Sequence, residues 1–130
     1  MHDKFGSFYG TTSECGSNQY GTIWMLSKTG KETVLHQFAG GGSDGCYPFA
    51  GVARDSNGNI YGNVTDCGFD NLGALYELNT RGTFSLLHSF NGSDGVGPLG
   101  EPLRTSKGML FGVTEQGGTY GGGTVWEYVP

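Results

Sequence analysis

The stretch that decides the fold is DSNGNIYGNVTD, residues 55–66, near the middle of the chain. Its central run, NIYGNVT at 59–65, contains β-branched and aromatic residues, and turn-forming residues flank it. Asn57-Gly58 between two such runs is a strong hairpin signal, because a type I′ turn needs a positive φ at both central residues. The sequence therefore predicts a tight structural turn at Asn57 and Gly58, followed by a β-strand.

The same stretch has oxygen-bearing side chains at 55, 57 and 59, which also suggests a calcium loop. An EF-hand loop requires glycine at its sixth position and a bidentate glutamate at its twelfth. Counted from Asp55, glycine is here at the fourth position and Asp66 at the twelfth. The corresponding stretches around Gly6 and Gly108 keep the glycine and lose the oxygens. We therefore predict a turn without a metal ion, and we expect no cofactor.

Glycine dominates the composition, with 26 of 130 residues. Glycine in a helix interior costs about 1 kcal/mol relative to alanine. No stretch as long as an average helix, about 11 residues, is free of Gly and Pro, so helices are not expected. The chain has 7 basic and 12 acidic residues, a net charge of −5, without a Lys/Arg cluster. This charge opposes nucleic-acid binding, and we expect no nucleic-acid partner.

No apolar run approaches the roughly 18 residues of a membrane span, so no membrane partner is expected. The first ten residues, MHDKFGSFYG, lack the apolar core of a signal peptide. We expect a cytoplasmic location for the sequence as written, and an extracellular or surface location if a leader has been removed.

The chain contains an internal repeat. A shift of 52 residues aligns Tyr9 with Tyr61 and LHQF at 35–38 with LHSF at 87–90, and a shift of 50 aligns Pro48 with Pro98. The length change lies where AGGGSDG becomes NGSDG. A repeat that changes length only in a glycine-rich loop behaves as a structural unit. We predict one repeat domain over 1–130, with units at about 1–47, 48–97 and 98–130.

Each unit holds up to four short strand candidates, clearest in the middle copy at 50–55, 59–65, 73–79 and 83–90. The first unit starts at its second candidate and the third stops after GTVWEYVP, so we expect three, four and three strands. Four strands in about 50 residues is the spacing of a propeller blade. We predict an all-β, β-propeller-like fold with three four-stranded blade units, the first and last incomplete. A homodimer would supply six blades and could close the ring.

The pattern D-S-x-G-N-[IL]-Y-G, followed by G-[TA]-[VL]-[FYW] and by L-H-x-F-x-G-S-D-G-x-x-P, resembles the GloVer (Gloeo/Verruco) tandem repeat of bacterial proteins. The match runs from Asp3 to Pro130 and recurs along the chain. The resemblance implies a repeat array with the strand spacing of NHL- or kelch-like propellers. It also implies a surface location and leaves the activity unassigned.

Aromatic residues recur at one position of the repeat, as Trp24, Tyr76 and Trp126. A lectin would use such rings to stack on sugars. The rings lie, however, within alternating strand patterns, and aromatic residues supply much of the buried area that small sheets need. We predict that these three aromatic residues are structural and lie between the blades.

Two histidines, His36 and His88, also share a repeat position. In FSLLHSF, a period of two places Leu86, His88 and Phe90 on one face of the strand. Each histidine is therefore predicted to lie in an apolar row and to bond a neighbouring backbone group. No second His, Cys or carboxylate stands at ligand spacing, which argues against metal or acid–base roles.

Polar loop residues gather at one end of the predicted blades, where a ligand could bind. We predict a ligand-binding rim made of Glu14, Asp44, Tyr47, Asp66 and Asp94. The alternative is that these acids belong to solvated Asp-Gly turns.

The three cysteines lie on the same rim. Cys46 lies in the connection between the blades that bear Cys15 and Cys67, so a disulfide could join Cys46 to either one. The odd number leaves at least one thiol free or intermolecular, and a reduced cytosolic state is equally compatible. A zinc site is not predicted because no C-x-x-C spacing is present.

Our leading functional hypothesis is a non-catalytic repeat module for binding or scaffolding, with itself and a glycan or protein as partners. Repetition with diversified loops suits binding, and no nucleophile elbow, P-loop or dinucleotide fingerprint is present. The first alternative is a carbohydrate-binding, lectin-like propeller. The second is a glycan-active hydrolase or lyase, which would need two rim carboxylates about 5–10 Å apart.

Overall fold

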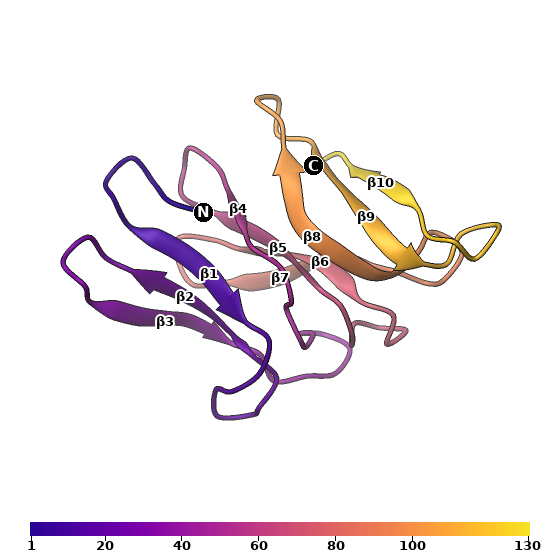
Figure 1. The fold of residues 1–130 in the computed structure, drawn as a ribbon, viewed down its shortest axis with the longest axis horizontal. Coiled ribbons are helices and arrows are strands. Elements are labelled where there is room, and N and C mark those ends of the chain that lie inside the picture. Colours follow the sequence, from indigo (N-terminus) through magenta and orange to yellow (C-terminus); the bar gives the residue numbers. More distant parts are fainter.

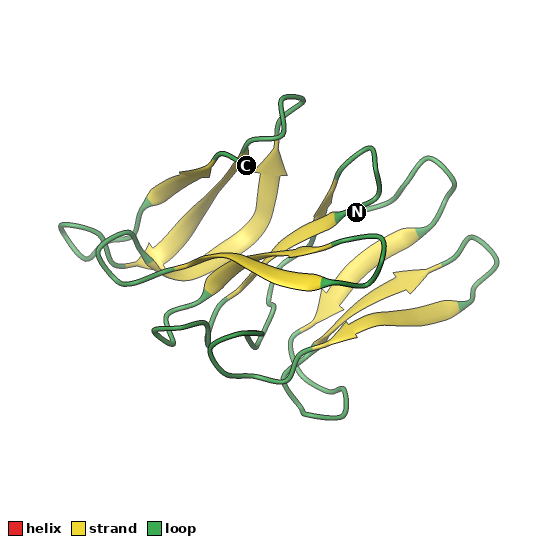
Figure 2. Cartoon of the chain, turned by 180° about the vertical axis from the view of Figure 1, so that it is seen from behind, coloured by secondary structure: helices red, strands yellow, loops and turns green.

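The computed structural model describes residues 1–130 and consists of strands, turns and loops (Figures 1 and 2). Ten strands form three antiparallel sheets with three, four and three members. The all-β prediction and the grouping of the strands are confirmed. No sheet is closed on itself. The chain has no helix that could cross a membrane.

The three sheets follow one another along the chain. The first sheet contains β1 (Phe8–Thr12), β2 (Thr22–Leu26) and β3 (Glu32–Gln37). The middle sheet contains β4 (Ala53–Arg54), β5 (Ile60–Val64), β6 (Ala74–Leu78) and β7 (Phe84–Ser89). The third sheet contains β8 (Val96–Arg104), β9 (Leu110–Gln116) and β10 (Val125–Tyr128). Spatial order equals chain order in each sheet, and the middle sheet lies between the other two (Figure 1).

The turn at Asn57-Gly58 differs from the predicted type I′ turn. Gly58 has a φ of 98°, but Asn57 does not have a positive φ. The amide of Gly58 donates to the carbonyl of Asp55 at 3.1 Å, and the amide of Asp55 donates to the carbonyl of Asn59 at 3.0 Å. This is a type I turn closed by a left-handed glycine. The glycine is required by its φ and Asn57 is not, which explains why only the glycine recurs at 6 and 108.

The side chain of Asp55 stabilises this longer turn from within. Its Oδ1 accepts the Asn59 amide at 2.8 Å, and its Oδ2 accepts the Asn59 side-chain amide at 3.0 Å and the Tyr61 hydroxyl at 3.3 Å. Asp3 makes the equivalent bonds in the first sheet, to two backbone amides and to the Tyr9 hydroxyl. Of the oxygens that suggested a calcium loop, the two of Asp55 therefore serve the turn itself, and that of Asn59 accepts the Thr80 amide at 3.3 Å.

Two apolar cores lie between the sheets. Successive residues of a strand point to opposite faces, so the middle sheet contributes to both cores. Ile60 and Tyr76 pack toward the first sheet, whereas Tyr61 and Leu75 pack toward the third. Strand β5 is consequently buried along its whole length.

A bulge in the middle sheet alters the predicted faces of β7. The β6–β7 register shifts between Leu75 and Tyr76, so that Leu75 pairs with His88 and Tyr76 with Leu86. Leu86 packs into the core beside the first sheet, and His88 lies on the side of the third sheet. The prediction that Leu86 and His88 share one face is therefore wrong, because the bulge inserts one residue between them.

The first strand of the middle sheet is shorter than the predicted range 50–55. The hydroxyl of Thr11, in the first sheet, lies 3.0 Å from the Pro48 carbonyl oxygen and 2.6 Å from that of Ala50. This backbone thus bonds the neighbouring sheet before the chain joins its own sheet at Ala53.

The repeated aromatic position lies across a glycine of the neighbouring strand. Tyr76 stands opposite Gly62 in the register, as Trp24 does opposite Gly10 and Trp126 opposite Gly112. A Cβ at Gly62 would lie 2.3 Å from the Tyr76 hydroxyl, and the other two glycines are equally close to their rings. Tyr76 is fully buried and its hydroxyl has no partner, while the two tryptophans are partly buried.

We expect Gly62→Ala to lower the free energy of unfolding by about 1–3 kcal/mol, because the new methyl group would force the Tyr76 ring from its place. Urea denaturation monitored by circular dichroism measures this change. Gly122→Ala is the matched control, since a Cβ there meets nothing within 4 Å and no positive φ is required. A Gly62→Ala protein as stable as the wild type would contradict the close approach of ring and glycine.

A disulfide joins the connection between the first and middle sheets to the loop between β5 and β6. It links Cys46 to Cys67, 21 residues apart, and leaves Cys15 free and exposed. Of the two pairings left open by the sequence, the structure therefore contains the one that joins Cys46 to the middle sheet. The Tyr47 amide donates to the Tyr20 carbonyl at 3.0 Å, so this segment contacts both sheets.

Replacing Cys46 and Cys67 together by serine should lower the free energy of unfolding by about 3 kcal/mol, because a closed loop of this length restricts the unfolded chain by about that amount. Thermal unfolding under non-reducing conditions gives the difference. The control Cys15→Ser should unfold like the wild type. Equal losses in both variants, or a disulfide-linked peptide containing Cys15, would show a different pairing.

Candidate functional site

Two predicted rim residues, Asp44 and Asp94, bind histidines. Nε2 of His36 lies 2.7 Å from Oδ1 of Asp44, and Nε2 of His88 lies 2.7 Å from Oδ2 of Asp94. The same carboxylates accept the backbone amides of Ala39 and Asn91. Each His–Asp pair thus ties the loop after the last strand to that strand. The prediction that the histidines bond a backbone group is wrong, because each imidazole is bonded instead to the carboxylate of an aspartate that follows it by six or eight residues.

The other predicted rim residues lie in different surroundings. Tyr47 is half-buried beside the disulfide, where its carbonyl accepts the Thr65 amide at 3.2 Å. Asp66 is exposed and its backbone forms an isolated bridge with Cys46. Glu14 is exposed in the loop between β1 and β2. The structure therefore brings Tyr47 and Asp66 together at the disulfide, and it gives Asp44 and Asp94 to two separate histidines.

Arginines with a structural role were not singled out from the sequence. The Arg54 guanidinium lies 4.7 Å from the centre of the Tyr9 ring, and Arg104 lies 5.7 Å from that of Tyr61. Arg54 also reaches the Asp3 carboxylate at 3.6 Å. The backbone amide of Ser7 is the main cause that lowers the pKa of Asp3. Desolvation opposes the shift, and Arg54 adds to it. Each contact joins the first strand of one sheet to the sheet before it.

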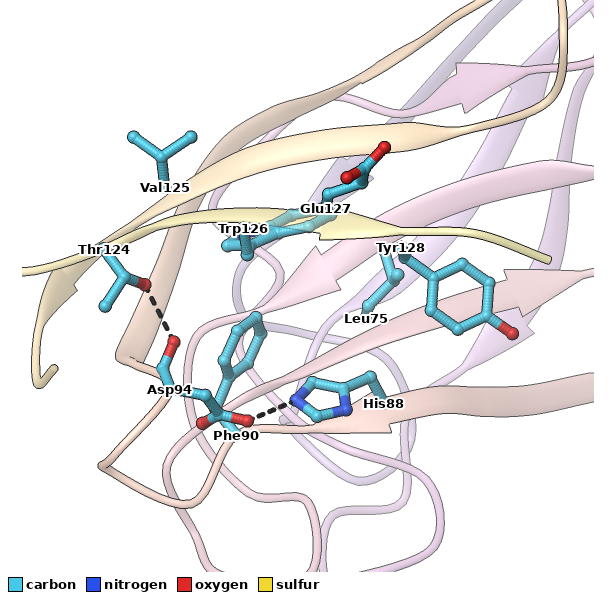
Figure 3. Close-up of a pocket in the computed structure, with 9 residues that line it drawn as sticks. All are labelled: Leu75, His88, Phe90, Asp94, Thr124, Val125, Trp126, Glu127 and Tyr128. Carbon is cyan, nitrogen blue, oxygen red and sulfur yellow. Dashed lines mark hydrogen bonds and ion pairs between the residues drawn. The ribbon is translucent and has the colours of Figure 1, made fainter.

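The most enclosed site lies between the middle and third sheets, under β10. It is a cavity of about 370 Å³, within the size range of ligand pockets. Figure 3 shows its walls, which come from β6, β7, the loop after β7 and β10. The lining residues are Leu75, His88, Phe90, Asp94, Thr124, Val125, Trp126, Glu127 and Tyr128. Two of these lining residues belong to sites predicted from the sequence: Asp94 to the ligand-binding rim and Trp126 to the structural aromatic position. The sequence did not predict that they line the same cavity.

The cavity combines an aromatic wall with a polar corner (Figure 3). The rings of Phe90 and Trp126 lie 6.0 Å apart at 59°, and His88 meets Phe90 edge-on at 5.0 Å. At the corner, the Thr124 hydroxyl donates to the Asp94 carbonyl at 2.8 Å. This bond and the His88–Asp94 pair hold the corner in place, so the aromatic wall faces a preformed space.

The equivalent place between the first and middle sheets is filled by Phe84. The Phe84 ring stacks on His36 with centroids 4.3 Å apart and an angle of 5°. It also contacts Phe38 at 5.6 Å and Tyr76 at 5.3 Å, and its backbone pairs with Leu78. The repeat counterparts of these four neighbours are four of the lining residues of the cavity, namely His88, Phe90, Trp126 and Tyr128.

The two places differ in how far their histidine side chains are exposed to solvent. The side chain of His36 is 19% exposed and that of His88 is 42% exposed, although both bond an aspartate at the same distance. Recognising the cavity required the contacts of Phe84, which join residues of two different sheets.

The model of the Gloeobacter/Verrucomicrobia repeat matches residues 1–130. No curated protein and no solved structure matches the chain. The family match extends over all three sheets, and it agrees with the resemblance carried by the repeated D-S-x-G-N-[IL]-Y-G and L-H-x-F patterns. The chain therefore belongs to the Gloeobacter/Verrucomicrobia repeat family.

Proposed function

We propose that the chain is a non-catalytic repeat module for binding or scaffolding, in which each sheet is a blade of a β-propeller-like array. One observation carries the proposal: positions that are buried between sheets are exposed on the two outer faces of the row. Exposed apolar faces of this kind mark interaction surfaces.

The outer face of the third sheet is the first of these surfaces. Ile23 and Leu75 are 0% and 1% exposed where they meet the next sheet, but their counterpart Val125 is 81% exposed. Likewise Ala53 is buried, whereas its counterpart Leu103 is exposed. We name this surface, made of Leu103, Val113 and Val125, the trailing face.

The outer face of the first sheet is its complement. Ile60 and Leu110 are 3% and 0% exposed against the preceding sheet, and their counterpart Phe8 is 52% exposed. We name this surface, made of Phe8, Trp24 and Val34, the leading face. A trailing face and a leading face are the two halves of the contact that the chain already forms twice.

The partner that fits both faces is a second copy of this chain. Two chains supply six blades, which is within the four to eight of known propellers, and a two-fold symmetric pair would cover both leading and both trailing faces. In this arrangement the homodimer is a six-bladed ring.

The disulfide is relevant to the cellular location of the protein. Disulfides persist in oxidising compartments and are rare in the reducing cytosol. The Cys46–Cys67 pair therefore supports an extracellular or surface location over a cytoplasmic one.

A carbohydrate-binding role is the second candidate, supported by aromatic rings at the loop tips. Phe69 and Tyr120 are strongly exposed and lie in equivalent loops, between β5 and β6 and between β9 and β10. Exposed rings of this kind can stack on the apolar face of a sugar.

We expect size exclusion with light scattering to give a mass near twice 13.7 kDa. Leu103→Asp and Phe8→Asp should each shift the mass toward the monomer, because each places a carboxylate in the proposed interface. Phe69→Asp is the control, since this residue is exposed outside both faces. A monomeric wild type at all concentrations tested would overturn the proposed pairing.

For the second candidate, a glycan array probed with the labelled protein should show at least one binder that is lost in a Phe69→Ala, Tyr120→Ala double variant. Loss of each ring that stacks on a sugar should weaken binding about tenfold, which corresponds to about 1.4 kcal/mol. An array without a binder above background would remove this candidate and leave the pairing proposal unchanged.

A further inference from the structure

We propose that a cleft between the first and middle sheets binds a small organic carboxylate. Arg54 would bind the carboxylate group, and apolar side chains would contact the body of the ligand. The cleft has a volume of about 390 Å³, which is within the size range of ligand pockets. The inference goes beyond the pairing of two chains, because the cleft lies within one chain and none of its lining residues belongs to the leading or trailing face.

The cleft combines an apolar wall with a basic rim. Arg54 and Arg81 line it, and no acidic residue does. The chain has only three arginines and a net charge of −5, so two arginines at one cleft make it a local positive site. The apolar wall comes from both sheets and consists of Met25, Leu35, Ile60 and Leu78. This combination fits a ligand that carries a negative charge on an apolar body.

Arg54 is partly buried and has unused hydrogen-bond donors. Its side chain is 21% exposed, and its Nε is buried without a hydrogen-bond partner. The Oδ2 atom of Asp3 lies 3.6 Å from its Nη1, which is beyond hydrogen-bond distance. The carboxylate of Asp3 already accepts two backbone amides and the Tyr9 hydroxyl. Because buried donors normally have acceptors, a ligand carboxylate would complete the bonding of the guanidinium.

The next interface shows a carboxylate at the equivalent position. Arg104 lies over the Tyr61 ring there, and its Nε is also without a partner, so the arginines of the two interfaces are alike. The counterpart of Met25, however, is Glu77, whose Oε1 accepts the Tyr61 hydroxyl at 3.3 Å. The chain itself thus supplies an acid beside one tyrosine–arginine pair and an apolar side chain beside the other. At the first interface the acid would come from the ligand.

The test uses cyclohexanecarboxylate, which joins a carboxylate to a compact apolar body. An NMR titration of the full chain should show saturable shifts, largest at the methyl groups of Met25, Leu35, Ile60 and Leu78. Cyclohexanecarboxamide has the same body without the charge, and acetate has the charge without the body. Each should bind at least about tenfold more weakly, because it lacks either the charge-assisted bond or the apolar contact.

Chain variants locate the site independently of the choice of probe. Arg54→Gln should weaken binding of cyclohexanecarboxylate about tenfold, because the charge that holds the carboxylate is removed. Arg104→Gln is the matched control, since it removes the same kind of contact with a tyrosine ring outside the cleft and should bind like the wild type. Met25→Glu should also weaken binding, because it places an acid of the chain where Glu77 lies in the next unit. Circular dichroism checks that each variant is folded.

Equal affinities of the wild-type chain for cyclohexanecarboxylate and its amide would overturn the proposal without any variant. Equal affinity for acetate would indicate a general anion contact and would overturn the ligand class, as would equal losses in the two arginine variants. Shifts confined to other parts of the chain, or no saturable shift up to about 50 mM, would also overturn it, because a ligand of this size should bind in the millimolar range. Light scattering tests the pairing of chains and the titration tests the cleft, so the two proposals can fail separately.

Discussion

Packing of one sheet against the next is the constraint on which the rest of this structure depends. The apolar face of a small sheet must be buried against another element, because it is otherwise exposed to water. The middle sheet solves this by burying both of its faces, which is why every residue of β5 is buried. Stability in such a row depends on contacts between neighbours, as in other repeat proteins. The first and third sheets each have one face that this solution leaves open.

Several repeated details of the sequence serve this packing. The glycine that follows Tyr61 in the repeat is needed because an aromatic ring of the next strand lies over it. In the middle sheet Tyr76 fills the space over Gly62. The His–Asp pair holds the loop that leads into the next sheet, and the histidine ring then becomes the platform for Phe84. Residue types usually associated with catalysis therefore have a structural task at the inner interface. The histidine at the equivalent position of the next interface, His88, is half-exposed beside a cavity.

The sequence was sufficient for much of the fold because the relevant signals are local. Strands of five or six residues, bounded by glycine and turn residues, could be located from alternation alone, and their grouping followed from the length of the repeat. The turn at 55–59 was placed correctly but assigned the wrong type, because the rule for Asn-Gly ignores the bonds that Asp55 makes to Asn59. The faces of β7 were wrong for a similar reason: a bulge at Leu75 and Tyr76 is invisible in a period of two.

For the candidate site, the sequence by itself determined the residue types and their recurrence: the family, the repeat unit, the aromatic position and the paired histidines and aspartates. Only the tertiary structure decided which of these residues meet. His88, Phe90 and Trp126 come from two sheets, and the cavity depends on their relative placement, which no local pattern encodes. Burial of Ile60 and exposure of Phe8 likewise come from one repeat position, because the environment of a side chain is set by the sheet packed against it.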